Sequence, residues 1–112
     1  MTLQEIIAKL DLKVLTAPRD FSAITLQGGY ASDLLSCVMA GAQPDNVWVT
    51  LQAHMNVVAV ASLREVAAVI ITEGAQPEAD VIAKANEQGV ILLSTSQPSY
   101  EVIGKLWETG IQ

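Results

Sequence analysis

The stretch from Ala67 to Ser96 constrains the fold of this chain more than any other. Two short apolar runs, Val69-Ile70-Ile71 and Val90-Ile91-Leu92-Leu93, stand on either side of a helix-length segment that begins near Pro77. Parallel strands that are buried on both faces have this continuous apolar character, and a helix connects one such strand to the next. The stretch therefore predicts a β-α-β unit.

The same pattern recurs along the chain. Four short apolar runs end in threonine at nearly regular intervals, and a helical pattern follows each run. The threonines are Thr25, Thr50, Thr72 and Thr95, and the expected helices span about 31–40, 55–65, 77–88 and 98–108. Repeated strand–helix units in so short a chain favour one compact sheet. We predict an α/β fold: a layered α/β/α domain with a mostly parallel sheet built from successive strand–helix units.

The first residues predict a separate start to the domain. Thr2 and Glu5 have the spacing of a capping box, so a helix is expected over residues 2–10. A short strand is expected from Leu12 to Leu15. With 112 residues, the chain is expected to form a single domain. Its residues 1–19 would form the N-terminal helix and short strand, and the repeated units would follow.

Charge excludes several classes of partner. Twelve acidic and six basic side chains give a net charge of −6, which disfavours nucleic acid and anionic membrane surfaces. The most apolar stretch, 55–71, contains charged residues and is too short to cross a membrane, and the first residues do not resemble a signal peptide. A cytoplasmic location is therefore expected. The one cysteine, Cys37, has no partner for an internal disulfide, and we expect it to be buried.

The carboxyl edge of the sheet is the predicted binding site. Strand carboxyl ends and helix amino ends meet there, and the free backbone N–H groups of the helices favour anions. The candidate ligand-binding residues are those at the expected junctions: Gln27, Gly28, Gly29, Tyr30, Thr50, Gln52, His54, Thr72, Glu73, Gly74 and Thr95. No catalytic residue, metal site or cofactor is predicted, because no phosphate-loop, dinucleotide or metal-ligand spacing is present.

Several of these residues have a simpler structural interpretation. Gly28-Gly29 suits either a pocket wall that touches phosphate or ribose, or a tight turn between strand and helix. His54 suits either a pocket or the start of a helix that Asn56 caps. The threonines suit either a site or plain strand ends. Trp48 and Trp107 suit either the core or a contact between subunits.

Three segments resemble the DRTGG domain family: Gln27 to Met39, Trp48 to Thr50, and Val69 to Gly74. The second half of the chain is also similar to the N-terminal domain of HPr kinase/phosphorylase. The residues concerned are Ile71 to Gly74, Pro77-Glu78, Gly89, Leu92 to Thr95 and Gly104 to Leu106. Together the resemblance covers about residues 20–108. DRTGG domains occur alone, between paired CBS domains in regulated pyrophosphatases, and in long phosphotransacetylases.

The resemblance implies a regulatory domain without chemistry of its own, often dimeric. Thr72 and Gly74 match the threonine and the final glycine of the motif that names the family, and Glu73 replaces its middle glycine. The resemblance places the family's Asp-Arg pair at Ala53-His54, so neither residue is retained. A lost arginine and a gained carboxylate favour a neutral or cationic ligand, or none, over tight phosphate binding.

Three functions follow as hypotheses. The first is a non-catalytic regulatory domain, a homodimer that senses a small metabolite or nucleotide at the carboxyl edge of its sheet. The second is an interaction module that dimerises or docks onto a partner enzyme or signalling protein without a small-molecule ligand. The third is a small enzyme in which His54 and Glu73 meet as an acid/base pair.

Overall fold

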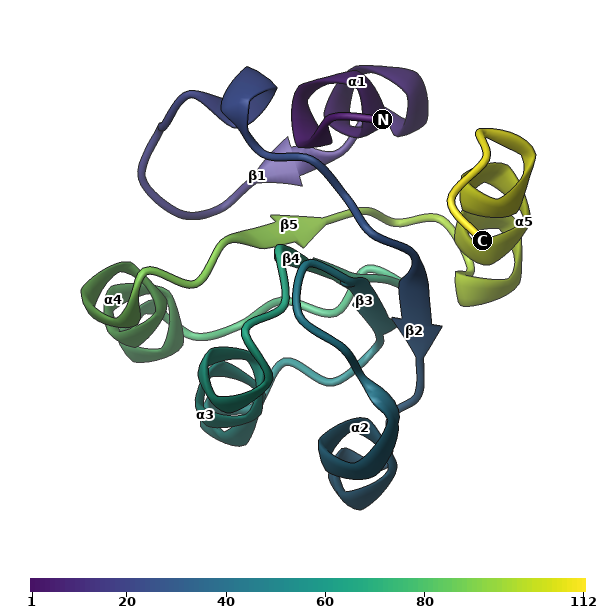
Figure 1. Cartoon of the computed structure of the whole chain (residues 1–112). Coiled ribbons are helices and arrows are strands. Elements are labelled where there is room, and N and C mark those ends of the chain that lie inside the picture. Colours follow the sequence, from purple (N-terminus) through teal and green to yellow (C-terminus); the bar gives the residue numbers. More distant parts are fainter.

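A computed structural model describes all 112 residues and shows three layers, with a five-stranded sheet between two layers of helices (Figure 1). The strands are β1 (Lys13–Val14), β2 (Gly29–Ala31), β3 (Val47–Thr50), β4 (Ala68–Ile71) and β5 (Leu92–Ser94). Their order in the sheet is β1-β5-β4-β3-β2. β1 pairs with β5 in the antiparallel sense, and all other pairs are parallel. The predicted layered α/β fold with a mostly parallel sheet is confirmed.

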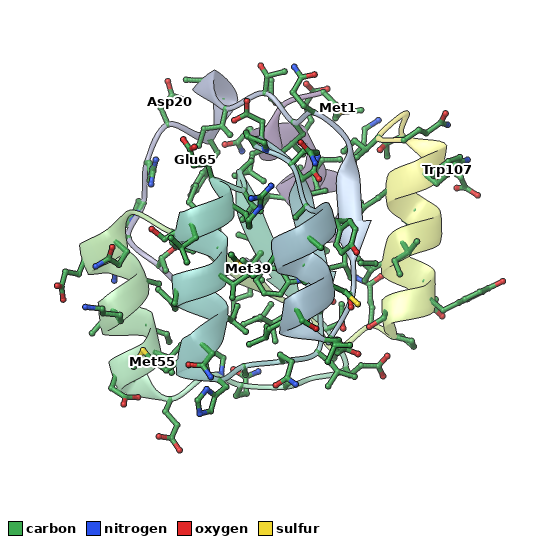
Figure 2. The ribbon with its side chains drawn as sticks, turned by 60° about the horizontal axis from the view of Figure 1, so that its bottom comes forward. Met1, Asp20, Met39, Met55, Glu65 and Trp107 are labelled. Carbon is green, nitrogen blue, oxygen red and sulfur yellow. The ribbon has the colours of Figure 1, made fainter.

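Five α-helices cover the two faces of this sheet. They are α1 (Leu3–Leu10), α2 (Leu35–Gly41), α3 (Met55–Arg64), α4 (Ala79–Gln88) and α5 (Ser99–Glu108). The helices α2, α3 and α4 lie side by side on one face (Figure 2), and α1 and α5 lie on the other (Figure 1). None of these helices is long and apolar enough to cross a membrane.

The connections explain this division of the helices. From β2 to β5 each parallel strand lies next to its predecessor, so the three crossover helices pack on the same face. After β5 the chain has no further parallel strand to reach, and α5 packs on the opposite face. The loops that follow β4 and β5 therefore leave the sheet toward opposite faces.

The core consists of two aliphatic clusters, one on each side of the sheet. Every residue of β4 is buried, with Ala68 and Ile70 facing one cluster and Val69 and Ile71 facing the other. Trp48 is fully buried among the residues that α2 and α3 cover, and its indole N–H donates to the Ser32 carbonyl at 3.0 Å. The predicted β-α-β unit is confirmed as β4-α4-β5.

The first predicted strand–helix unit is wrong. Residues 23–25 form no strand: Phe21–Ala23 is a short 3₁₀ helix, and Thr25 makes only an isolated bridge with Thr2. The chain crosses the face of the sheet here, from the β1 edge to the β2 edge, and buries Phe21 and Leu26 under α1. The apolar residues on either side of this run therefore fill the core beneath a helix, with Ile24 partly buried against them, and the run does not enter the sheet.

The strand that takes this place is β2, which lies a few residues later. Because β2 extends through Ala31, α2 begins at Leu35 and not at the predicted position near 31. Gly28 precedes β2 with φ +77, and a Cβ there would lie 3.2 Å from the Gln112 carbonyl oxygen. The glycine pair thus serves close packing at the amino end of an edge strand.

Asn46 fixes the chain where it enters β2. This side chain is buried; its Oδ1 accepts from the Gln43 N–H at 2.9 Å, and its Nδ2 donates to the Gln27 carbonyl. The Gln27 N–H in turn donates to the Asp45 carbonyl at 2.9 Å. The Asn46 amide therefore joins the turn before β3 to the segment before β2.

We expect Asn46→Ala to lower the free energy of unfolding by about 1–3 kcal/mol, because it removes two part-buried hydrogen bonds that join these segments. Gln43→Ala is the matched control: its exposed side chain makes one long hydrogen bond, and its effect should stay within about 0.5 kcal/mol. Urea denaturation of both variants measures the difference. Equal losses would contradict this role for Asn46.

The predicted capping box at the first helix is confirmed. The Thr2 hydroxyl accepts from the Glu5 N–H at 3.3 Å, and the Glu5 carboxylate accepts from the Thr2 N–H at 3.1 Å. The backbone hydrogen bond from Thr2, with a second from its hydroxyl, holds the pKa of Glu5 below its ordinary value. The deprotonated carboxylate is the form that the folded state favours.

Because the pKa of Glu5 is lowered on folding, its contribution to stability should be complete above its ordinary pKa. It should be lost as the pH falls through the lowered value. Glu5→Gln removes the titrating group, so acid unfolding of this variant should depend less steeply on pH. An NMR titration of the Glu5 carboxyl carbon checks the direction directly. A pKa at or above the ordinary value would refute the capping assignment.

Candidate functional site

Three of the four threonines share the carboxyl edge of the sheet, and the fourth does not. Thr50 ends β3, and Thr72 and Thr95 directly follow β4 and β5. Thr25 pairs with Thr2 beside α1. The prediction that each of the four threonines lies at the carboxyl end of a strand is therefore wrong for Thr25, because the run before it is not a strand.

Four candidate residues consequently lie away from this edge. Gln27 and Gly28 are at the amino edge beside Asp45 and Asn46, and Gly29 and Tyr30 lie within β2. The Tyr30 hydroxyl donates to the Cys37 carbonyl at 3.1 Å. Cys37 itself is exposed, so the expectation that it is buried is wrong.

Thr50 and Thr72 are internal supports of the edge. The Thr50 hydroxyl donates to the Asp33 carboxylate at 2.8 Å, and the Gln52 N–H donates back to the same hydroxyl at 3.1 Å. The Thr72 hydroxyl forms a hydrogen bond with the Ser99 hydroxyl. With exposed fractions of 1% and 0%, neither threonine is open to a ligand.

Glu73 connects the loops that follow β4 and β5. Its backbone adopts φ +62, the left-handed region where the motif of the resembling family has glycine. Its carboxylate accepts from the Ser99 N–H at 2.7 Å and so occupies the amino end of α5. Its own N–H donates to the Gln97 carbonyl at 3.0 Å. The Gly74 N–H donates to the Thr95 carbonyl at 3.1 Å.

His54 has the corresponding position at α3. Its Nδ1 accepts from the Asn56 N–H at 3.1 Å, so His54, and not Asn56, caps this helix. No hydrogen bond or ion pair joins His54 to Glu73, because each is held at the start of a helix on a different face of the sheet. The arrangement therefore does not form the predicted acid/base pair.

A polar hollow of about 560 Å³ opens over the carboxyl ends of β4 and β5. We refer to it as the polar hollow. It is lined by Lys9, Leu10, Asp11, Lys13, Gly74, Gln76, Ser94, Thr95, Ser96, Gln97 and Lys105. Of the predicted residues, Gly74 and Thr95 line it. It lies between the two loops that leave the sheet toward opposite faces, which is the place where open α/β sheets bind ligands.

The other side of the polar hollow is formed by the N-terminal elements. α1 ends at Leu10, and the antiparallel β1 starts at Lys13, so both meet the carboxyl ends of the parallel strands. Gln97 braces the junction: its Nε2 donates to the Leu10 carbonyl at 2.9 Å and to the Thr95 hydroxyl at 3.0 Å, and its Oε1 accepts from the Lys105 ammonium.

Sequence reasoning missed Lys9, Asp11, Lys13, Gln76 and Lys105. Four of these residues come from α1, β1 and α5 or the turn between them, and none follows an expected parallel strand directly. Their meeting depends on the antiparallel placement of β1 beside β5. No short-range pattern in the chain signals that placement.

A second hollow at the same edge, of about 450 Å³, includes His54. It adjoins the polar hollow at Gln76 and carries two carboxylates, from Glu78 and Asp80. No group of three or more His, Cys, Asp or Glu side chains that could hold a metal ion lies anywhere in the chain. This hollow therefore offers hydrogen-bonding groups and negative charge but no metal-ligand set.

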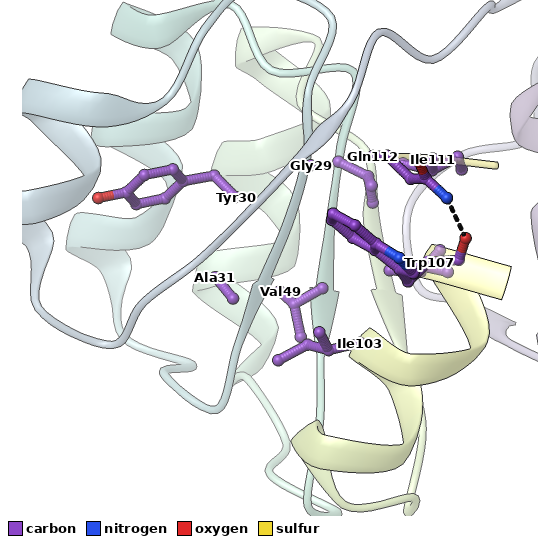
Figure 3. Close-up of a pocket in the computed structure, with 10 residues that line it drawn as sticks. Gly29, Tyr30, Ala31, Val49, Ile103, Trp107, Ile111 and Gln112 are labelled. Carbon is purple, nitrogen blue, oxygen red and sulfur yellow. Dashed lines mark hydrogen bonds between the residues drawn. The ribbon is translucent and has the colours of Figure 1, made fainter.

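An apolar groove of about 150 Å³ lies at the β2 edge of the sheet, between β2 and α5 (Figure 3). Trp107 and Ile103 of α5 face Gly29 and Val49 across it, whereas Tyr30 points away to the opposite side of the sheet. The Gln112 side chain closes one end by donating from Nε2 to the Trp107 carbonyl at 3.1 Å.

The sequence matches a known family of domains. The family model described as "DRTGG domain" matches residues 5–109, nearly the whole chain. The chain belongs to the DRTGG domain family. Glu73 and Gly74, which the resemblance sets at the glycine pair of the family's motif, both have left-handed backbones. No functionally curated protein matches the sequence.

A solved structure agrees with this DRTGG assignment. The chain resembles the CBS and DRTGG domains of the regulatory region of Clostridium perfringens pyrophosphatase, crystallised with the activator diadenosine tetraphosphate. The TM-score is 0.77 at 12% sequence identity; the match covers 94% of this chain and 45% of the pyrophosphatase chain. At this identity the likeness establishes a shared fold, and the chain spans less than half of that relative.

The contribution of Glu73 to the stability of the carboxyl edge can be tested. We expect Glu73→Ala to lower the free energy of unfolding by about 1–2 kcal/mol, because it removes the cap of α5 and keeps the left-handed strain that the parent already has. Glu73→Gly also loses the cap but relieves the backbone, so it should be the more stable of the two by about 1 kcal/mol. Urea unfolding of both variants, with Glu87→Ala on α4 as the control, tests this order. An alanine variant as stable as the glycine variant would rule out strain at Glu73.

Proposed function

We propose that this DRTGG domain is a non-catalytic regulatory domain that acts as a homodimer and senses a small metabolite or nucleotide in the polar hollow. The observation that carries the proposal is the position of the polar hollow between the diverging loops after β4 and β5. Its volume suits a small metabolite. The nucleotide activator bound to the related pyrophosphatase region supports a sensing role for domains of this fold.

The arrangement of the titratable residues supports a role without catalysis. Catalysis by nucleophile and base needs two such groups within hydrogen-bond reach. His54 and Glu73, the candidate pair, are both engaged as helix caps, and exposed Cys37 lies on α2, away from both. The His54 and Glu73 side chains therefore stabilise the carboxyl edge, and the polar hollow remains open to a ligand.

Thermal unfolding against a panel of metabolites and nucleotides tests ligand sensing. A ligand at one hundred times its Kd should add about 2.7 kcal/mol to the free energy of unfolding. NMR amide shifts should then locate the bound compound at Gly74 and Thr95 to Gln97. Binding elsewhere on the domain, or no stabilisation by any compound, would count against the proposal.

The second candidate function is a dimerisation module without a small-molecule ligand, and the exposed face of α5 favours it. Tyr100, Ile103 and Trp107 are 89%, 40% and 60% exposed and recur at helical spacing. With Gly104 they form what we call the α5 seam. The α5 seam continues into the apolar groove beside the edge strand β2.

A second copy of this chain is the occupant that suits the α5 seam. The four residues are symmetric about the midpoint of Ile103 and Gly104, so an antiparallel two-fold pairing sets Tyr100 against Trp107 and Ile103 against Gly104. Gly104 costs a helix interior about 0.5–1 kcal/mol relative to alanine. Within one copy nothing requires it, since a Cβ there would meet no atom within 4 Å.

The area of the α5 seam indicates how strong such a dimer would be. Aromatic side chains bury roughly 150–250 Å² each, so the exposed parts of four of them would bury on the order of 600 Å² across the two-fold axis. Stable dimers bury about 1,200 Å² or more. The groove and the β2 edge must therefore contribute as well, and we expect a concentration-dependent dimer.

Gly104→Ala separates the two effects of this glycine. The variant should unfold at higher denaturant concentration under monomeric conditions, by about 0.5–1 kcal/mol, because alanine favours the helix. It should dimerise more weakly, because the added methyl group keeps the paired helices apart. Sedimentation velocity over a concentration series measures the dimer, and Ser62→Ala on α3 is the control. A variant that dimerises as well as the parent would exclude the α5 seam as the interface.

A further inference from the structure

Half of the cations of an acidic chain surround the polar hollow. Lys9, Lys13 and Lys105 line it, while Asp11 is its one acidic residue. The whole chain has six basic and twelve acidic side chains. A random distribution of charge on such a chain would make its hollows acidic, as the neighbouring hollow with Glu78 and Asp80 is.

None of these three ammonium groups forms an ion pair with a carboxylate, although Lys9 also attracts the Glu5 carboxylate one helical turn away. The single ion pair of the chain joins Lys84 to Glu87 on α4 at 3.4 Å, and neither residue lines the polar hollow. Lys105 is held in place by the Gln97 amide oxygen, which is a neutral acceptor. All three charges are therefore available to a ligand, and bringing them together costs repulsion that an anion would relieve.

The loops add hydrogen-bond donors next to this charge. The backbone N–H groups of Gln76 and Ser96 donate to no acceptor in the protein. The Thr95 and Ser96 side chains add hydroxyl groups at the same rim. Ammonium groups combined with hydroxyl and backbone donors match the oxygens of a phosphate group.

The carboxylate of Glu73 does not oppose such a ligand. It accepts from the Ser99 N–H at the amino end of α5, and it does not line the polar hollow. The charge that the sequence adds within the DRTGG motif is thus used inside the protein. A lost arginine and this carboxylate favour a neutral or cationic ligand from the sequence, whereas in the structure three lysines from other elements supply positive charge.

We infer that the polar hollow binds a phosphorylated small molecule, whose phosphate oxygens are held by Lys9, Lys13 and Lys105. This inference rests on the proposed function, which assigns a small ligand to the same hollow, and it adds the chemical class of that ligand. The lysines come from α1, β1 and α5, three elements that flank the loops after β4 and β5. Binding would therefore fasten the N-terminal elements to the parallel sheet.

Inorganic pyrophosphate is the probe for this inference. Titration into the full chain, followed by NMR, should shift the amide signals of Gly74, Gln76 and Thr95 to Gln97. The affinity should fall as sodium chloride is added, because exposed charges are screened. Lys13→Gln and Lys105→Gln should each weaken binding by about fivefold, the effect of losing one charge pair about 4 Å apart in water.

Lys84→Gln is the matched control, since it removes one positive charge from the opposite face of the sheet. It should leave the affinity for pyrophosphate within a factor of about two. If Lys84→Gln weakens binding as much as Lys13→Gln, the anion responds only to overall charge, and the inference is overturned.

The remaining outcomes separate the inference from the proposed function. If a neutral compound from the panel shifts the amides of the polar hollow and pyrophosphate does not, the phosphate assignment fails while ligand sensing stands. If no compound shifts these amides, both fail. Thermal unfolding of the Lys13→Gln and Lys105→Gln variants without ligand should match the parent closely, which keeps loss of binding distinct from loss of folding.

Discussion

The face of the sheet on which each helix packs determines where the loops of this domain diverge and where the polar hollow forms. Four parallel strands follow one another across the sheet in chain order, and their strongly apolar residues need cover on both faces. The crossover helices α2 to α4 cover one face only. The other face is covered by α1 and α5, which lie at the two ends of the chain. The divergence of the loops after β4 and β5, and with it the polar hollow, follows from this requirement.

The parts of the fold that the sequence predicts are those with local signals. The runs Val47 to Val49 and Val69 to Ile71 are apolar throughout, which is the pattern of a strand that is buried on both faces. The capping box of Thr2 and Glu5 marks the residue at which α1 begins. The helices between about 55 and 108 lie within two residues of their expected limits because turns and caps mark their ends.

The errors arise where packing over long distances overrides a local pattern. Residues 23–25 resemble a strand, but α1 lies over the same face and the flanking Phe21 and Leu26 are buried beneath it. Gly29-Tyr30-Ala31 forms the edge strand although it contains only one large side chain. Of the candidate site, Thr95 and Gly74 line the polar hollow, whereas the lysines depend on β1 lying antiparallel beside β5.

The polar residues at the carboxyl edge have two roles, according to whether they line the polar hollow. Thr50, Thr72 and Glu73 use their hydrogen-bonding groups on partners within the protein, so they fix the loops and leave little for a ligand. Thr95 and Lys105 line the polar hollow and are tied to each other through Gln97. The first group therefore holds the loops in place, and the second lines the polar hollow with a lysine that forms no ion pair. A substitution at Glu73 should therefore change the stability of this edge, whereas a substitution among the lysines of the polar hollow should change the charge that it offers to a ligand.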